Sequence, residues 1–122
     1  MAVSAFQDYP LADRDREWDG AAAEKRIRAW AGAQDEPNAK YRAAHVWYDS
    51  DKRNNFTACK LLIADVVDGK VRAVPHGITA AGNIMQGARG GIELPAADVD
   101  RVKSHLAKYY KKMHEDAPWD RG

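Results

Sequence analysis

The stretch Lys60-Leu-Leu-Ile-Ala-Asp-Val-Val-Asp-Gly-Lys-Val-Arg-Ala-Val-Pro75 decides the fold of this chain. Two runs rich in β-branched residues meet at Asp68-Gly69, a pair that tolerates the positive φ angles of a type I′ hairpin turn. Pro75 ends the second run, because proline has no N–H to donate to a strand ladder. An isolated hairpin is only marginally stable in water. We therefore expect helices to cover this one.

A first helix is predicted over residues 20–31, where apolar residues recur at helical spacing. Asp19 suits the N-cap, and Trp18 before it suits a hydrophobic staple against Ala23. Gly32 then stops the helix, because glycine readily adopts the left-handed conformation that ends helices.

A last, longer helix is predicted over residues 95–113, because its two kinds of side chain separate onto different arcs. The apolar arc consists of Val99, Val102, Leu106, Tyr109, Tyr110 and Met113. The basic arc consists of Arg101, His105, Lys108 and Lys112. This segregation is the clearest periodic signal in the chain.

The segments between these helices add further elements. Residues 45–48 read as a strand that extends the hairpin, and residues 56–67 as a strand that is broken near Cys59. Residues 75–88 read as a helix in which Gly82 weakens the helical propensity. We expect another element to pack closely at that glycine.

The resulting fold is α+β: an antiparallel hairpin or small sheet packs against the N-terminal helix and the long C-terminal helix. Residues 19–115 form a single domain, since 122 residues suffice for one core. Residues 1–18 form an extended arm, and residues 116–122 an irregular tail. The aromatic residues of the arm either pack on the domain of the same chain or bind another subunit. The candidates for partner binding are Phe6, Tyr9 and Trp18.

Bulk composition restricts the partners and the compartment. The chain has 19 Lys and Arg against 18 Asp and Glu, which gives a formal net charge of +1. This balance does not indicate nucleic acid or a membrane as a partner. Its single cysteine, Cys59, excludes an internal disulfide. The N-terminus lacks the basic start and long apolar run of a signal peptide, and no segment has the apolar length of a membrane span.

Motifs for metals and cofactors are incomplete, so neither is predicted. The histidines lack the close spacing of zinc ligands, and Arg53 interrupts the calcium-loop start at Asp49 and Asp51. Gly82-Asn-Ile-Met-Gln-Gly87 has the glycine spacing of a phosphate loop. However, Ala88-Arg89 stands where that motif needs Lys followed by Ser or Thr.

Catalytic groups are equally hard to assemble, and we predict that the chain is not an enzyme. None of its serines lies in a strained-turn motif such as Gly-x-Ser-x-Gly. Cys59 reads as a small buried hydrophobe, and Asp65 as a residue on an exposed strand face. The weakest alternative is an acid/base pair of Asp65 with a histidine.

The basic arc of the last helix is the best candidate for contact with anions. It would bind phosphates or an acidic protein surface, with the turn at residues 87–91 adding one arginine. The candidate residues are Arg89, Arg101, Lys108, Lys111 and Lys112. The simpler reading is a solvated helix face whose lysines favour the helix dipole.

Several short segments in the second half of the chain resemble segments of a known class of proteins. They are Trp47-Tyr48-Asp49, Lys60-Leu61-Leu62, Ala64-Asp65-Val66-Val67-Asp68-Gly69-Lys70, Val74-Pro75, Gly87-Ala88-Arg89-Gly90-Gly91, Leu94-Pro95, Tyr109-Tyr110-Lys111-Lys112-Met113 and Pro118-Trp119. Residues 40–119 thereby resemble a segment of tailed-bacteriophage head-gene products, including proteins encoded near head maturation proteases. The resemblance implies a phage or prophage origin and a place in or near the capsid. It implies no protease role, because the chain lacks a Ser/His catalytic set.

We therefore expect a non-enzymatic phage structural protein of the decoration or cement type, located in the virion or the bacterial cytoplasm and not secreted. Its partners would be capsid or other head subunits, with a homo-oligomer as a further form. An aromatic surplus and the N-terminal arm favour this role, because arms and open strand edges add contacts to a shell. The alternative is a small nucleic-acid-binding module that uses the basic face of the last helix.

Overall fold

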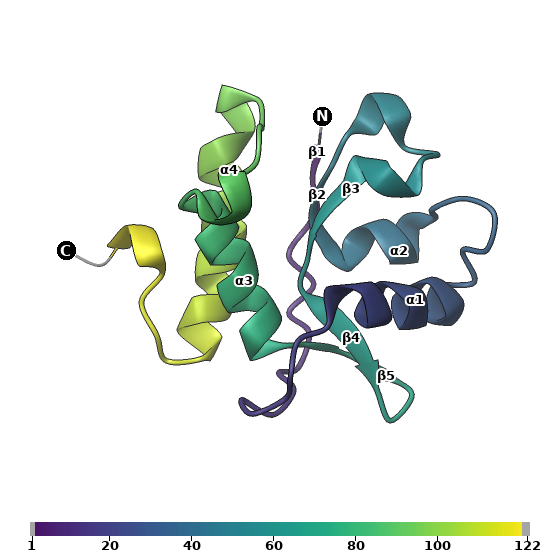
Figure 1. The fold of residues 1–122 in the computed structure, drawn as a ribbon, viewed down its shortest axis with the longest axis horizontal. Coiled ribbons are helices and arrows are strands. Elements are labelled where there is room, and N and C mark those ends of the chain that lie inside the picture. Colours follow the sequence, from purple (N-terminus) through teal and green to yellow (C-terminus); the bar gives the residue numbers. More distant parts are fainter. Residues whose placement is uncertain (1, 121–122) are drawn as a thin grey trace.

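A computed structural model describes residues 2–120, apart from the side chain of Arg89, and its architecture is α+β as predicted (Figure 1). The helices are α1 (Gly20–Ala31), α2 (Ala39–Ala43), α3 (Pro75–Met85) and α4 (Ala96–Lys112). The strands are β1 (Ala2–Val3), β2 (His45–Tyr48), β3 (Cys59–Leu62), β4 (Ala64–Val67) and β5 (Lys70–Ala73). In the described part of the chain, no helix has both the length and the apolar character needed to cross a bilayer.

The strands form two antiparallel sheets, whereas the sequence suggested one. The order β1-β2-β3 makes a three-stranded sheet, and β4-β5 forms the hairpin. Residues 56–58 of the predicted strand over 56–67 form a 3-10 turn that ends at Cys59, as predicted, and the strand is interrupted again at Ile63. The Ile63 N–H donates to the carbonyl of Ala44, while its own carbonyl accepts from the N–H of Val74. These bonds lead the chain from one sheet to the other, so β2 extends β3 and not the hairpin.

The hairpin turn is as the sequence predicts. Asp68 has φ of 53° and Gly69 has φ of 76°, both in the left-handed region. The register pairs Val67 with Lys70 and Ala64 with Ala73. Local turn chemistry therefore sets this register.

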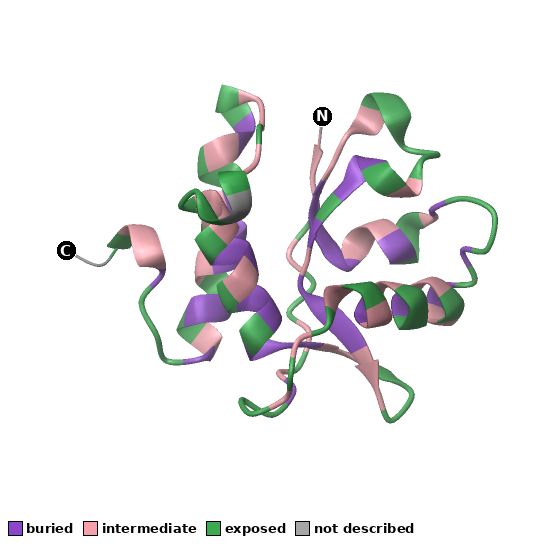
Figure 2. Cartoon of the chain, in the orientation of Figure 1, coloured by how far each residue is buried: buried purple, intermediate pink, exposed green. Residues whose placement is uncertain are grey.

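The helices lie on two sides of the strands (Figure 1). α1 packs on the hairpin strand β4, while α4 packs on β1, β2 and α3. The N-terminal helix thus covers the hairpin, and the C-terminal helix covers the small sheet. Buried residues accordingly form two clusters, one around α3 and α4 and one around α1 and α2 (Figure 2).

The ends of α1 confirm the predicted caps. The Asp19 carboxylate accepts from the N–H of Ala22, and Gly32 ends the helix with φ of 69°. Trp18, which the sequence suggests as a staple, lies against α3. A Cβ added to Gly77 would lie 3.0 Å from atoms of the Trp18 ring.

α4 has the predicted position and apolar face, with one correction. His105 is buried, only 6% exposed, although the sequence placed it on the basic arc. The Gly82 prediction is confirmed: a Cβ at this position of α3 would overlap the hydroxyl of Tyr110 on α4. The glycine thus allows the two helices to approach closely. α3 itself ends at Met85, three residues before the predicted end at residue 88.

Candidate protein-binding groove

The N-terminal segment is extended, and its aromatic residues contact the body of the same chain. The Phe6 ring lies 4.7 Å from that of Tyr109 and 5.8 Å from that of His105, between ring centroids. The backbone N–H of Tyr9 donates to the Tyr109 hydroxyl at 3.4 Å. Of the two alternatives that the sequence left open for the arm, the described residues therefore take the docked one. Trp18 is likewise half-buried on α3.

Among the predicted basic residues whose side chains are described, Lys112 is engaged within the fold and the others are exposed on α4. The Lys112 ammonium donates to Asp8 and to the carbonyl of Tyr9, each at 2.8 Å. Lys108 lies over the Phe6 ring, 5.2 Å from its centroid. Lys108 is nevertheless exposed and lines one depression together with the exposed Arg101, while Lys111 is also exposed. The side chain of Arg89 lies outside the described part of the structure.

Asp65 is buried, which corrects the prediction of an exposed strand face. Its side chain is 3% exposed and pairs with Arg26 and Arg16. Burial by itself would raise the pKa of this carboxyl. The hydrogen bonds from the two arginines outweigh burial and lower the pKa below its ordinary value. An ionised, paired carboxylate is a poor candidate for the acid/base partner of a histidine.

Two buried histidines are bonded to backbone carbonyls. Nδ1 of His45 contacts the carbonyl of Tyr41 at 2.9 Å, and Nδ1 of His105 contacts that of Ser4 at 2.8 Å. Burial lowers the pKa of His45 to about 4 and also lowers the pKa of His105. Both imidazoles are therefore neutral near pH 7 and serve as internal hydrogen-bonding groups.

The Cys59 thiol is buried, as predicted, and burial raises its pKa to about 11. A thiol with so high a pKa is a weak nucleophile near neutral pH. Within residues 2–120, no group of three or more His, Cys, Asp or Glu side chains could hold a metal ion.

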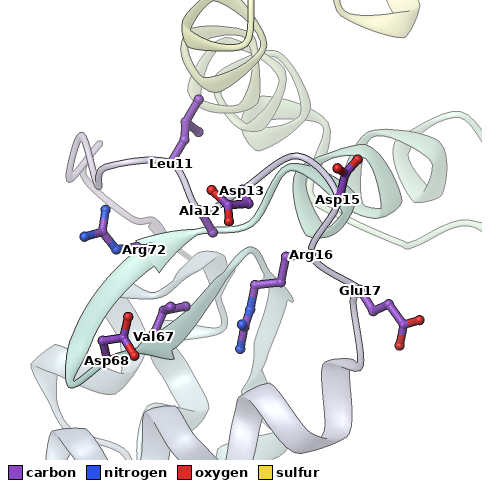
Figure 3. A pocket seen from close by; sticks show the side chains of 9 residues that line it. All are labelled: Leu11, Ala12, Asp13, Asp15, Arg16, Glu17, Val67, Asp68 and Arg72. Atoms are coloured by element: carbon purple, nitrogen blue, oxygen red, sulfur yellow. The ribbon is translucent and has the colours of Figure 1, made fainter.

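A depression of about 630 Å³ between the N-terminal segment and the hairpin turn is lined by charged residues (Figure 3). Its carboxylates do not converge: Asp15 and Glu17 point outward, away from Asp68. Arg16 extends from the rim towards the buried Asp65. This arrangement supports the anchoring of the N-terminal segment and gives no cluster that would chelate a ligand.

Two other depressions adjoin along β3, and we call them together the β3 groove. One, of about 630 Å³, lies beside α3 and is lined by Trp18, Gly77, Ala80 and Ile84 among others. The second, of about 500 Å³, lies beside α1 and is lined by Lys25, Arg28, Phe56 and Lys60 among others. They share Gly20, Ala21, Leu61 and Leu62. The shared residues make the two depressions one continuous surface.

The floor of the β3 groove has an unusual backbone. β3 is an edge strand of its sheet, with β2 on one side. Within it, Leu61 has φ of 61°, a conformation that a bulky L-residue rarely adopts. Such strain costs about 1 to 3 kcal/mol and is concentrated at ligand clamps and other functional positions. A strand at the edge of its sheet that lines a depression and contains a strained residue is a candidate site for another chain.

The β3 groove was not predicted from the sequence. Its lining comes from three separate segments, and its width depends on small residues that give no binding signal by themselves. Gly20 and Ala21 begin α1, and Ala80 lies on the facing side of α3. The available hint was the run of small residues at both places, read together with a strand edge.

The comparisons with known proteins do not add a relative. No family model fits the chain, and no curated protein or solved structure is significantly similar to it.

Proposed function

We propose that the chain is a non-enzymatic interaction protein of a tailed-bacteriophage head, which binds a segment of a head subunit in the β3 groove. The observation that carries the proposal is the edge strand β3, which contains the strained, largely buried Leu61 and lines the depressions beside α1 and α3. Edge strands flanked by side-chain depressions are a recurring way to bind an extended chain.

The state of the titratable groups supports a non-enzymatic role. Asp65 is paired with two arginines, while His45 and His105 are bonded to carbonyl groups. Catalysis by acid or base needs a group that faces the reacting atoms with a pKa near the working pH. Each of these groups is instead engaged within the fold.

The choice of a head subunit as partner comes from the resemblance of residues 40–119 to tailed-phage head-gene products. That region includes β3 and α3, which form the floor and one wall of the groove. Decoration and cement proteins act by adding contacts to a shell, so an accessible strand edge suits such a role.

Co-sedimentation tests the proposal. The purified chain is mixed with empty shells of the head subunit and, separately, with double-stranded DNA at low and high salt. We expect the chain to sediment with the shells and to bind DNA at neither salt concentration. Salt-dependent DNA binding without shell binding would replace the proposal by the nucleic-acid alternative, in which Arg101, Lys108 and Lys111 contact phosphates.

A further inference from the structure

We infer that the occupant of the β3 groove is an extended peptide segment that places a large apolar side chain beside α3 and an acidic side chain beside α1. This inference rests on the proposed protein-binding function and adds the chemistry of the partner. It follows from the different lining of the two halves of the groove.

The half beside α3 is lined mainly by small and apolar residues, with Asp19 and Asn83 as its polar members. Trp18, Ala80 and Ile84 line this half, and each is half-buried. The Trp18 ring is held in place by its close contact with Gly77. A fixed indole beside small residues leaves room for one large apolar side chain, and such anchors dominate the energetics of protein interfaces.

The half beside α1 is positively charged. Lys25 and Lys60 are exposed on its rim, and neither takes part in an ion pair among the described residues. The acid of this half, Glu24, is already engaged: Arg28 pairs with it at 2.8 Å, and the Tyr41 hydroxyl donates to it at 2.9 Å. The unmatched charge is therefore positive and complements a carboxylate of the partner.

Leu61 makes the edge selective. Its left-handed backbone interrupts the regular alternation of N–H and C=O groups that a long strand would need for pairing. Natural sheets use such irregularities to prevent indiscriminate edge-to-edge pairing. The side-chain contacts in the two halves must then supply the specificity. The backbone of β3 forms the floor of the groove and can pair with the partner only over a short length.

The test is a selection of binders from a displayed library of short random peptides on the full chain. We expect enrichment of peptides that carry Asp or Glu near a large apolar residue. Ala21→Trp fills the junction of the two halves and should weaken the binding of selected peptides by about tenfold or more. Ala29→Trp is the matched control, because Ala29 is exposed on the same helix and does not line the groove. It should leave binding unchanged.

A charge reversal tests the acidic part. Lys60→Glu should shift the enrichment from acidic to basic peptides, whereas Lys70→Glu, at an exposed strand position outside the groove, should not. Circular dichroism confirms that each variant is folded before it is used. Enrichment without acidic residues, or equal binding to the Ala21→Trp variant, would overturn the inference.

The shell assay separates this inference from the proposed function. If the Ala21→Trp variant sediments with shells as well as the Ala29→Trp variant does, the chain binds head subunits elsewhere and the inference is wrong. If neither the variants nor the unmodified chain binds shells while acidic, apolar peptides are still selected, the groove chemistry holds and the head partner is wrong.

Discussion

Arg26 on α1 binds the carboxylate of Asp65 on β4 through two parallel hydrogen bonds, from Nε to Oδ1 at 2.7 Å and from Nη2 to Oδ2 at 2.8 Å. Arg16 adds a third bond to Oδ2 at 3.1 Å. The carboxylate is buried while Arg26 is 46% exposed. Without the arginines the buried charge would have no compensating partner, whereas Arg26 would still be solvated by water. These bonds tie the N-terminal segment and α1 to the hairpin.

Replacement of this acid should destabilise the fold. Asp65→Asn removes the charge that both arginines face and buries amide N–H groups beside them. We expect the free energy of unfolding to fall by about 2 to 3 kcal/mol, measured by urea denaturation. Asp68→Asn is the control, because Asp68 is exposed in the hairpin turn and asparagine tolerates its positive φ. A loss as large in the control would contradict the role of the Arg26 pair.

Stability should depend on pH through His45. Burial lowers its pKa to about 4 in the folded chain, while the pKa of an unfolded histidine is about 6.5. Between these values the unfolded chain binds a proton that the folded chain does not. The free energy of unfolding should therefore fall as the pH is lowered from about 6.5 to about 4.

His45→Gln should flatten this part of the profile, and the remaining slope should include the contribution of His105. Unfolding curves at a series of pH values provide the measurement. His76→Gln, at an exposed position of α3, serves as the control. An identical slope in the unmodified chain and the His45→Gln variant would show that His45 is protonated equally easily in both states.

Contact between α3 and α4 should depend on the absence of a side chain at Gly82. Gly82→Ala improves helix propensity by about 1 kcal/mol, but its Cβ would overlap the Tyr110 hydroxyl. We expect a net loss of about 1 to 3 kcal/mol, as for other overpacked cores. In a Tyr110→Phe background the overlapping atom is gone, so the same substitution should cost less. Additive losses in this double-mutant cycle would argue against the contact.

The N-terminal segment should stabilise the monomer through Phe6. Phe6→Ala removes the contacts with Tyr109 and His105, and we expect a loss of about 1 to 2 kcal/mol. Gln7→Ala, at the neighbouring exposed position, should change the free energy of unfolding little. Light scattering supplies the decisive second readout. A change of oligomeric state without loss of stability would mean that the segment is exchanged between subunits.

Local signals predicted much of the fold. The caps of α1, the Asp68-Gly69 turn and the apolar face of α4 each depend on residues that are close in sequence. The interactions that form these features involve residues only a few positions apart, so the sequence suffices to place them. The break at Ile63 could not be found in this way, because it depends on hydrogen bonds to Ala44 and Val74.

Long-range partners explain what the sequence did not predict about the candidate sites. Asp65 looked exposed because its partners Arg26 and Arg16 are 39 and 49 residues away along the chain. The β3 groove depends on α1, β3 and α3 coming together, and the φ angle of Leu61 has no local sequence signal. Periodicity identified helices but could not show which of their faces stay uncovered.

The docked N-terminal segment has a consequence for the order in which the chain folds. Ser4, Asp8 and Arg14 bond to His105, Lys112 and Glu115, partners that lie 101 to 104 residues away. During synthesis these early residues have no binding site until α4 has left the ribosome. Closing so long a loop has a large entropic cost before its contacts form. These N-terminal residues are therefore among the last of the described chain to reach their native place, and Phe6 covers His105 and Tyr109 of α4 only when they arrive.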